Sequence, residues 1–329
     1  MGSKVATASN PSASLGSETI VSARPRRVAL SKEEHRRLAH GRNARRELTA
    51  WGFLGPMFLF FCVFLVIPTV GVVWWSMQSG GMVTGSTFVG LNNFITLPDE
   101  VTAGAAIANT LTFALMSIPP ALILALLIAM VLARVKHGGA VYRFLVYLPV
   151  LVPGVVAALI WIFLTNIDFG LFNTVLQVVG LPHQVWLSVG NALPVLAALD
   201  VWRNVGYWTI FFYAAVIGLP EELFQAAALD GANALRRFRH LTLPLLRPMI
   251  MFAIIIATIW GLQIFDTPLI LTDGGPGTAT TTVILQVWRY ALSASGQVGL
   301  AAAISLALLV AILALTAVQL RLLRGRGGT

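Results

Sequence analysis

Six apolar stretches, each long enough to cross a lipid bilayer, limit this chain to one class of fold. A membrane-spanning helix needs about 20 predominantly apolar residues. Hydrophobic residues make up 57% of the 329 positions, and charged residues only 11%. The sequence therefore predicts an all-α membrane protein with six transmembrane helices. The expected spans are Trp51–Met77, Asn109–Ala133, Phe144–Leu164, Leu193–Ile217, Met249–Leu271 and Gly299–Leu320.

The distribution of basic residues predicts the orientation of these spans. Of the 22 Lys and Arg, ten precede Trp51, three lie between the second and third spans, four between the fourth and fifth, and three after the sixth. Loops rich in Lys and Arg stay on the cytoplasmic side. We therefore expect a multi-pass protein of a bacterial-type cytoplasmic (inner) membrane, with both termini in the cytoplasm. The net charge of +9 then reflects orientation and lipid contact, and no nucleic-acid partner is expected.

Tails of unequal length flank the spans. Residues 1–48 are expected to form a cytoplasmic tail that is disordered at first and then becomes a basic helix after a capping box at Ser31–Glu34. Its arginines either meet anionic lipid head groups or act only as a topological anchor. Residues 49–322 are expected to form the six-helix domain, and residues 323–329 a cytoplasmic C-terminal tail. Prolines within three of the spans predict kinks.

Charged and polar residues share one face of the fourth span, at a spacing of i, i+3, i+4 and i+7. A charge near the bilayer centre costs about 2.5–3.5 kcal/mol on insertion scales, so these residues require a reason. Either they line a path for a hydrophilic solute, or Asp200 and Arg203 neutralise one another and hold helices together. The candidate pathway residues are Asp200, Arg203, Asn204 and Tyr207 in the fourth span, with Gln263 and Asp266 in the outer half of the fifth.

A polar segment, Leu219–Pro248, separates the fourth and fifth spans. Pro220 followed by two glutamates is a typical helix start, and Gly231 supplies a turn that other residues would resist. A second short helix is expected to end at Pro244. A short helix with small residues can lie in a groove of a partner protein. The segment therefore predicts a docking element.

Catalytic and metal-binding patterns are weak in this chain. The five histidines lie in tails or loops, and no two have metal-ligand spacing. The glycine-rich segment Thr272–Thr282 lacks the Gly-Lys-Ser/Thr ending of a phosphate-binding loop. The single cysteine, Cys62, excludes an internal disulfide. We expect no catalytic residue, no metal site and no cofactor bound by this chain.

The polar segment resembles the cytoplasmic loop of permease subunits from binding-protein-dependent ABC importers. That loop has the pattern E-A-A, three residues, G, nine residues, I-x-L-P. Here Gln225-Ala226-Ala227, Gly231 and Leu241–Pro244 match with both gaps, while Gln225 replaces Glu and Leu241 replaces Ile. The stretches FVGLNNF, DVWRNVGYW and LTDGGPGTAT are similar to the carbohydrate-uptake branch, the maltose and glycerol-3-phosphate type.

The resemblance implies a type I ABC importer permease-like bundle, with a cytoplasmic coupling helix between the fourth and fifth spans. The chain would be half of the pathway for a carbohydrate or polyol, and not an enzyme. The implied partners are a cytoplasmic ATPase dimer that binds ATP and Mg, a second homologous permease, and an extracellular or periplasmic solute-binding protein. The residues implied in ATPase coupling are Glu221, Glu222, Phe224, Gln225, Ala226, Ala227, Asp230, Gly231, Ala232, Leu241 and Pro244.

Two other classes of protein remain open at this point. A self-sufficient secondary transporter or channel for a small polar solute would also explain six spans and buried charges, although not the loop pattern. A structural or signalling membrane protein would carry no solute. The residues do not select one sugar or polyol.

Overall fold

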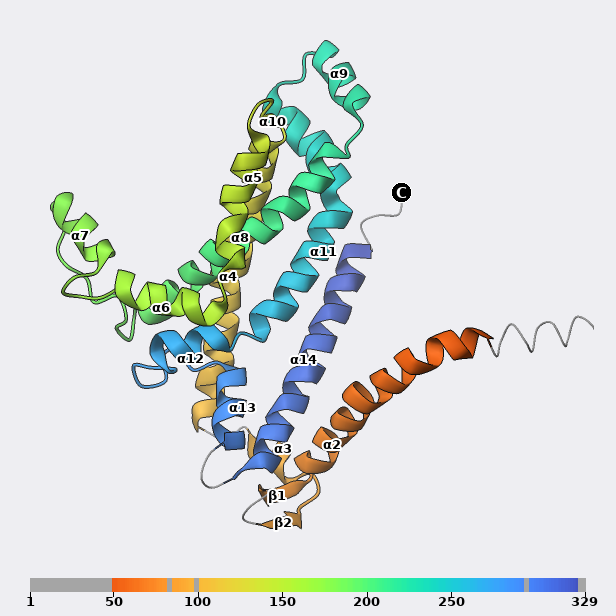
Figure 1. Cartoon of the computed structure of the whole chain (residues 1–329), viewed down its shortest axis with the longest axis vertical. Coiled ribbons are helices and arrows are strands. Elements are labelled where there is room, and N and C mark those ends of the chain that lie inside the picture. Colours follow the sequence, from red (N-terminus) through yellow and green to blue (C-terminus); the bar gives the residue numbers. More distant parts are fainter. Residues whose placement is uncertain (1–48, 82–84, 98–100, 293–295, 325–329) are drawn as a thin grey trace, which may run out of the picture. The chain divides into compact units, whose positions relative to one another are not determined.

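A computed structural model describes residues 49–81, 85–97, 101–292 and 296–324 (Figure 1). The expected N-terminal tail, with its capping box and basic helix, lies outside the described residues. The chain divides into two units, residues 1–65 and 66–329. In the first unit, residues 49–61 are helical and lead into a π-helical turn, η1 (Cys62–Val66). The second unit holds the other elements and is described by itself below.

Helices dominate the described residues, as the composition predicts. Four of them are long and apolar enough to cross a bilayer, or up to six if each of two bent helix pairs counts as one span. The four are Thr49–Ser76, Thr102–Leu132, Ala234–Leu262 and Val298–Leu322. The pairs are Gly139–Leu151 with Gly154–Leu164, bent by 93°, and Ala192–Ile217 with Glu221–Leu229, bent by 70°.

The centre of the second unit is a close packing of α4 (Val101–Leu132) on α8 (Ala192–Ile217) (Figure 1). Ala125 and Ala129 of α4 are fully buried in one apolar cluster with Trp208 and Phe212 of α8. Small side chains let two helix backbones approach closely, which is how helices associate where lipid offers no hydrophobic contrast. The third member of this cluster is α11 (Leu243–Leu262), which contributes further buried alanines.

The third expected span is broken by prolines. Helix α5 (Gly139–Tyr147) leads into a short 3-10 helix, η3 (Leu148–Leu151), and Pro153 precedes α6 (Gly154–Leu164). Proline removes a backbone donor and clashes with the preceding turn, so a break here has a local cause. The kink predicted for this span is confirmed. By contrast, Pro119 and Pro120 lie inside α4, which continues to Leu132.

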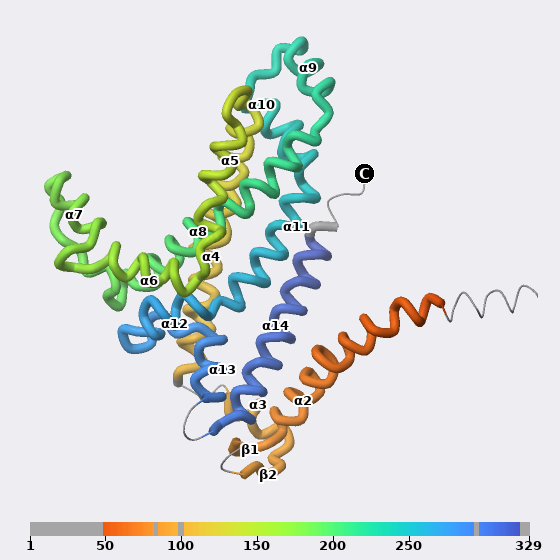
Figure 2. Tube along the Cα trace, viewed as in Figure 1, coloured from red at the N-terminus to blue at the C-terminus, as the bar shows by residue number. Residues whose placement is uncertain are grey.

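The fifth span is shorter than expected. The sequence predicts one helix over Met249–Leu271, but α11 ends at Leu262 and residues 263–265 separate it from α12 (Asp266–Thr272). Gln263 and Asp266 therefore lie at a helix break and not along one continuous face. Helix α12 packs against α6 (Figure 2).

The end of the second unit that carries α9 (Glu221–Leu229) differs from prediction in one respect. Gly231, with φ of 75°, makes the expected turn after α9. The side chain of Asn233 then caps α10 (Ala234–Arg237) by accepting a hydrogen bond from the Arg236 amide at 2.9 Å. A π-helical turn, η4 (Phe238–Thr242), joins α10 to α11. Pro244 lies in the first turn of α11 and does not end the second helix, because a proline there sacrifices no helical hydrogen bond.

A small hairpin lies at the opposite end of the second unit from α9 (Figure 1). Strands β1 (Gln78–Gly81) and β2 (Gly85–Phe88) pair antiparallel, with Gln78 opposite Phe88, so the fold is not strictly all-α. Helices α2 (Ile67–Ser76), α3 (Asn92–Thr96) and α14 (Val298–Arg324) pack around it. Asn93 donates to the carbonyls of Ser76 and Gln78, both at 2.8 Å. We call this end the hairpin end.

Candidate functional site

A cavity of about 340 Å³ lies beside the break between α11 and α12. Its polar lining comes from α8 and from the break, and it includes five of the six residues that the sequence singles out. These are Asp200, Arg203, Asn204, Gln263 and Asp266. The break is what brings the last two towards α8. Residues separated by about 60 positions thus meet at one site.

The sixth residue, Tyr207, contacts residues of the cavity lining but does not itself line the cavity. Its ring centroid is 5.0 Å from that of Trp208 and 5.3 Å from that of Trp260, and both tryptophans line the cavity. Tyr207 therefore supports the aromatic side of the site, while Trp208, Trp260 and Phe265 present the rings. Trp260 was missed by the sequence reasoning, since it lies on α11 in a stretch that reads as ordinary apolar helix.

Arg203 forms its ion pair with Asp266, with 3.5 Å between Nη1 and Oδ2. The alternative in which Asp200 and Arg203 neutralise one another is therefore not the arrangement found. Asp200 instead accepts a hydrogen bond from the Asn204 side chain at 2.8 Å. The Arg203 and Asp266 side chains are 23% and 40% exposed, so the pair faces the cavity and is not sealed in the core.

The backbone of Gly154, the first residue of α6, lies directly against this ion pair. A Cβ at this position would overlap Asp266 Oδ2 and come within 2.5 Å of Arg203 Nη1. Only glycine lets a backbone approach a charged pair this closely. The sequence reasoning missed Gly154, because it treated Pro153 and its neighbours only as a source of a kink.

One donor of the site is left unsatisfied. Among the described residues, the Nε of Arg203 is buried without a hydrogen-bond partner. Buried polar groups are nearly always paired, and exceptions call for an explanation. Four other buried side-chain atoms of the described residues, on Ser117, Thr209, Thr267 and Gln319, also have no hydrogen-bond partner.

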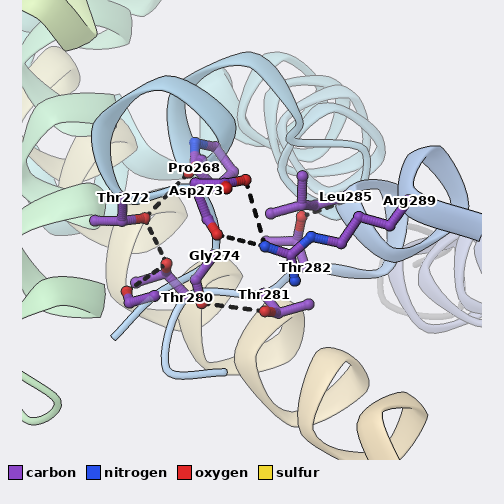
Figure 3. A network of polar contacts seen from close by, with 10 residues as sticks. Pro268, Thr272, Asp273, Gly274, Thr280, Thr281, Thr282, Leu285 and Arg289 are labelled. Carbon is purple, nitrogen blue, oxygen red and sulfur yellow. Dashed lines mark hydrogen bonds and ion pairs between the residues drawn. The ribbon is translucent and has the colours of Figure 1, made fainter. Parts of the chain in front are cut away.

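Threonines between α12 and α13 form hydrogen bonds that support the break. Thr282, fully buried before α13 (Val283–Leu292), donates to the Ile264 carbonyl at 3.1 Å. It also accepts from the Leu285 amide at 3.4 Å (Figure 3). Ile264 lies in the break, and the residue that would donate to its carbonyl in a continuing helix is Pro268, which has no N–H. The hydroxyl of Thr282 therefore supplies the hydrogen bond that Pro268 cannot.

The glycine-rich segment forms the rest of this network. Thr272 and Thr280 share a hydrogen bond of 2.5 Å, and Thr281 donates to the Gly274 carbonyl at 3.1 Å (Figure 3). Arg289 of α13 pairs with the Asp273 side chain at 3.3 Å and also bonds its carbonyl. The segment is thus a connection between α12 and α13 that is held by several hydrogen bonds and an ion pair. Sequence reasoning excluded a phosphate-binding loop but found no role for it.

Helix α4 forms hydrogen bonds with the same segment. Asn109 donates to the carbonyls of Thr278 and Thr281, at 2.6 and 3.1 Å. Thr110, one helical position further on, accepts from the Val283 amide at 3.0 Å. The start of α13 is therefore fixed to α4, and through Thr282 to the break beside the cavity.

The polar segment is a second, separate site at the α9 end. Glu221, Glu222 and Gln225 are exposed, and Gln225 donates to the Glu221 carboxylate at 3.3 Å. Leu229 is 90% exposed and Leu235 is 72% exposed. Large apolar side chains held in the open on an ordered turn are typical of a docking surface. Leu241 and Pro244 lie further along, in η4 and α11, and not in α9 or its turn.

The described residues contain no group of three or more His, Cys, Asp or Glu side chains that could hold a metal ion. The side chains that line the cavity offer hydrogen bonding, charge and ring stacking.

Comparison with known proteins identifies the family. Residues 101–326 match the binding-protein-dependent transport system inner membrane component. This chain belongs to that family. The permease resemblance of the α9 segment is thereby confirmed for the chain as a whole, because the match covers most of its length.

Named relatives agree with this assignment. The chain is 33% identical over 273 residues to the trehalose/maltose transport system permease protein MalF of Thermococcus litoralis, covering 82% of this chain and 92% of that protein. It is 34% identical over 281 residues to the sn-glycerol-3-phosphate transport system permease protein UgpA of Escherichia coli O6:K15:H31, covering 83% and 93%. The relatives are transport subunits, so this family member is a permease and not an enzyme.

Solved structures share the fold. A chain of a bacterial ABC transporter involved in the import of the acidic polysaccharide alginate superposes with a TM-score of 0.76 at 23% identity, covering 88% of this chain and all of that one. A chain of the bacterial alginate transporter in complex with an alginate pentasaccharide-bound periplasmic protein gives 0.75 at 22% identity, covering 84% and 94%. The helical arrangement is therefore that of an ABC importer permease.

Proposed function

We propose that this chain forms half of the translocation pathway of an ATP-driven importer for a carbohydrate or related polyol. The observation that carries the proposal is the cavity at the break between α11 and α12, where Arg203 and Asp266 face open space beside aromatic rings. Hydroxyl groups need donors and acceptors, and sugar rings need flat apolar faces, and this site offers both. The solute-transport alternative for the buried charges is thus favoured over helix locking.

Relatives support the substrate class. Their names refer to trehalose and maltose and to sn-glycerol-3-phosphate, and the structurally similar transporter imports alginate. All of these solutes carry hydroxyl groups; trehalose and maltose are neutral, whereas sn-glycerol-3-phosphate and alginate are anionic. Delivery by an extracellular or periplasmic solute-binding protein is part of the proposal, and so is a second homologous permease that supplies the other half of the pathway.

We further propose that α9 is the coupling helix. Its exposed face, the Gly231 turn and the exposed Leu229 would enter a groove of a cytoplasmic ATPase, which binds ATP and Mg. The contacting residues would be Glu221, Glu222, Phe224, Gln225, Ala226, Ala227, Asp230, Gly231 and Ala232. Leu241 and Pro244 would instead shape the connection into α11.

The topology follows from this placement. With α9 in the cytoplasm, the hairpin end faces outwards and both termini are cytoplasmic. The bent pair of α5 and α6 then makes one span and α8 alone makes another, which with the four long apolar helices gives six spans within residues 49–322. Residues 1–48 and 323–329 are then cytoplasmic tails. The basic residues near α9, which include Arg236, Arg237 and Arg239, agree with this orientation.

The test is purification of the tagged chain in mild detergent, followed by identification of the proteins that accompany it. The proposal expects an ATPase and a second permease, and ATP-dependent carbohydrate uptake after reconstitution with the solute-binding protein. A self-sufficient transporter or channel would instead carry solute as this chain alone in vesicles without ATP. Such uptake would overturn the proposal.

A further inference from the structure

The cavity beside the α11–α12 break carries more negative than positive charge. Its lining contains two carboxylates, Asp200 and Asp266, and one cation, Arg203. From this balance we infer that the half-pathway built by this chain selects uncharged, polyhydroxylated solutes, such as neutral sugars, over anionic ones, such as sugar phosphates or uronates. The inference rests on the proposed function and names the substrate class of the same site.

The single cation is already engaged. Arg203 Nη1 lies 3.5 Å from Asp266 Oδ2, and Gly154 of α6 packs directly against the same pair. An anionic solute that approached Arg203 would have to compete with Asp266 and would leave that carboxylate without its partner. Repulsion between like charges is stronger beside a protein wall than in bulk water, so an anion gains little at this cation.

Other cations of the described chain do not offset this balance. Arg289 pairs with Asp273 in the segment between α12 and α13. Arg143 of α5 donates to the Tyr213 hydroxyl at 2.8 Å. Within the part of the chain that the structure describes, Arg203 is the only Lys or Arg among the residues lining the cavity.

A neutral sugar matches the remaining groups. Its hydroxyls can donate to the carboxylates of Asp200 and Asp266 and accept from the amides of Asn204 and Gln263. The indole of Trp260 is 48% exposed, so it offers a ring face for the apolar side of a sugar. The cavity volume of about 340 Å³ lies near the lower end of ligand pockets, which run from about 300 to 1,000 Å³, and suits a small sugar unit.

The experiment compares two solutes that differ only by a phosphate, trehalose and trehalose 6-phosphate. The assembled complex of this chain, its second permease and the ATPase is placed in lipid nanodiscs without the solute-binding protein, because that protein has a selectivity of its own. Saturation-transfer NMR measures the binding of each sugar. We expect trehalose to bind at least tenfold more tightly than its phosphate.

Two substitutions at one position provide the matched control. Gln263 is exposed and lines the cavity, so replacing it should not disturb folding. Gln263→Lys adds a cation and is expected to reduce the preference for trehalose at least threefold, whereas Gln263→Glu is expected to increase it. Asp200→Asn, which removes one carboxylate and leaves the Arg203–Asp266 pair intact, should act in the same direction as Gln263→Lys.

Each outcome decides a separate claim. Phosphate binding equal to or tighter than trehalose binding overturns the charge inference, as does an identical preference in the Lys and Glu variants. If the complex still shows ATP-dependent carbohydrate uptake, the proposed function survives that result. If neither sugar binds and no carbohydrate is taken up by the complete importer, both claims fall.

Discussion

Asp266 Oδ2 lies 3.5 Å from Arg203 Nη1, so the residue that opens α12 neutralises the cation in the middle of α8. The two carboxylates of the cavity thereby have different partners, since Asp200 accepts from Asn204. An ion pair between separate helices can break and reform when the helices move, whereas a pair within one helix stays with it. Movement of α12 relative to α8 would therefore break the pair and change the charge that the cavity presents.

Arg203→Gln tests whether this ion pair serves transport. The pair is partly exposed to the cavity, so its loss should cost little stability, on the order of 1 kcal/mol. We expect the complex to assemble and carbohydrate uptake to fall more than tenfold. Size-exclusion chromatography and uptake in proteoliposomes provide the two readouts. Failed assembly of the variant would instead indicate that Arg203 serves to hold the helices together.

Gly154→Ala should abolish transport through geometry alone. The added methyl group would overlap Asp266 Oδ2 and force α6 away from α8 and α12. Overpacking of this kind typically costs about 1–3 kcal/mol. A lower melting temperature and a loss of uptake are expected together.

The control for this substitution is Gly71→Ala in α2, where nothing lies within 4 Å of the new Cβ. It should leave uptake unchanged. Equal uptake by the two alanine variants would mean that the close approach at Gly154 is not needed for transport.

Thr282→Val removes the hydroxyl that satisfies the Ile264 carbonyl while keeping the shape of the side chain. A buried carbonyl without a partner costs about 1–3 kcal/mol. We predict a lower unfolding temperature and reduced uptake, because the break would lose its support. Thr282→Ser keeps the hydroxyl and should behave like the natural chain. If valine and serine give the same melting temperature, the break is held by other contacts.

Gly231→Val tests the turn after α9. With φ of 75°, this residue has a backbone conformation that β-branched side chains avoid, while asparagine tolerates it. We expect Gly231→Val to lose most of the ATPase that copurifies with the tagged chain and Gly231→Asn to retain it. Full ATPase recovery with valine would show that the turn geometry does not matter for docking.

The sequence predicts the class of fold and much of the cavity for a physical reason. Long apolar stretches have few structural solutions, and charged residues within them stand out because they are costly. Asp200, Arg203 and Asn204 were therefore identifiable from α8 alone. The turn at Gly231 was identifiable because glycine in a polar loop is a local signal, while the docking role of this segment stays a prediction.

The missed features depend on contacts between distant segments. Gly154 becomes important only when α12 folds back towards α6, and the break that allows this is held by Thr282, 18 residues beyond Ile264. Residues 249–271 do contain one local cause of a break, because Pro268 cannot donate to the Ile264 carbonyl, but the span was predicted from its hydrophobicity alone. The hairpin of β1 and β2 was missed for a similar reason, because its strands have only four residues each.

The central claim is that this chain is one half of an ATP-driven carbohydrate pathway. The most direct measurement is uptake of labelled trehalose and related neutral sugars into proteoliposomes that hold this chain, its copurifying partners and the solute-binding protein. The account predicts uptake that requires ATP and is lost in the Arg203→Gln variant. Uptake by this chain alone, without ATP or partners, would contradict it.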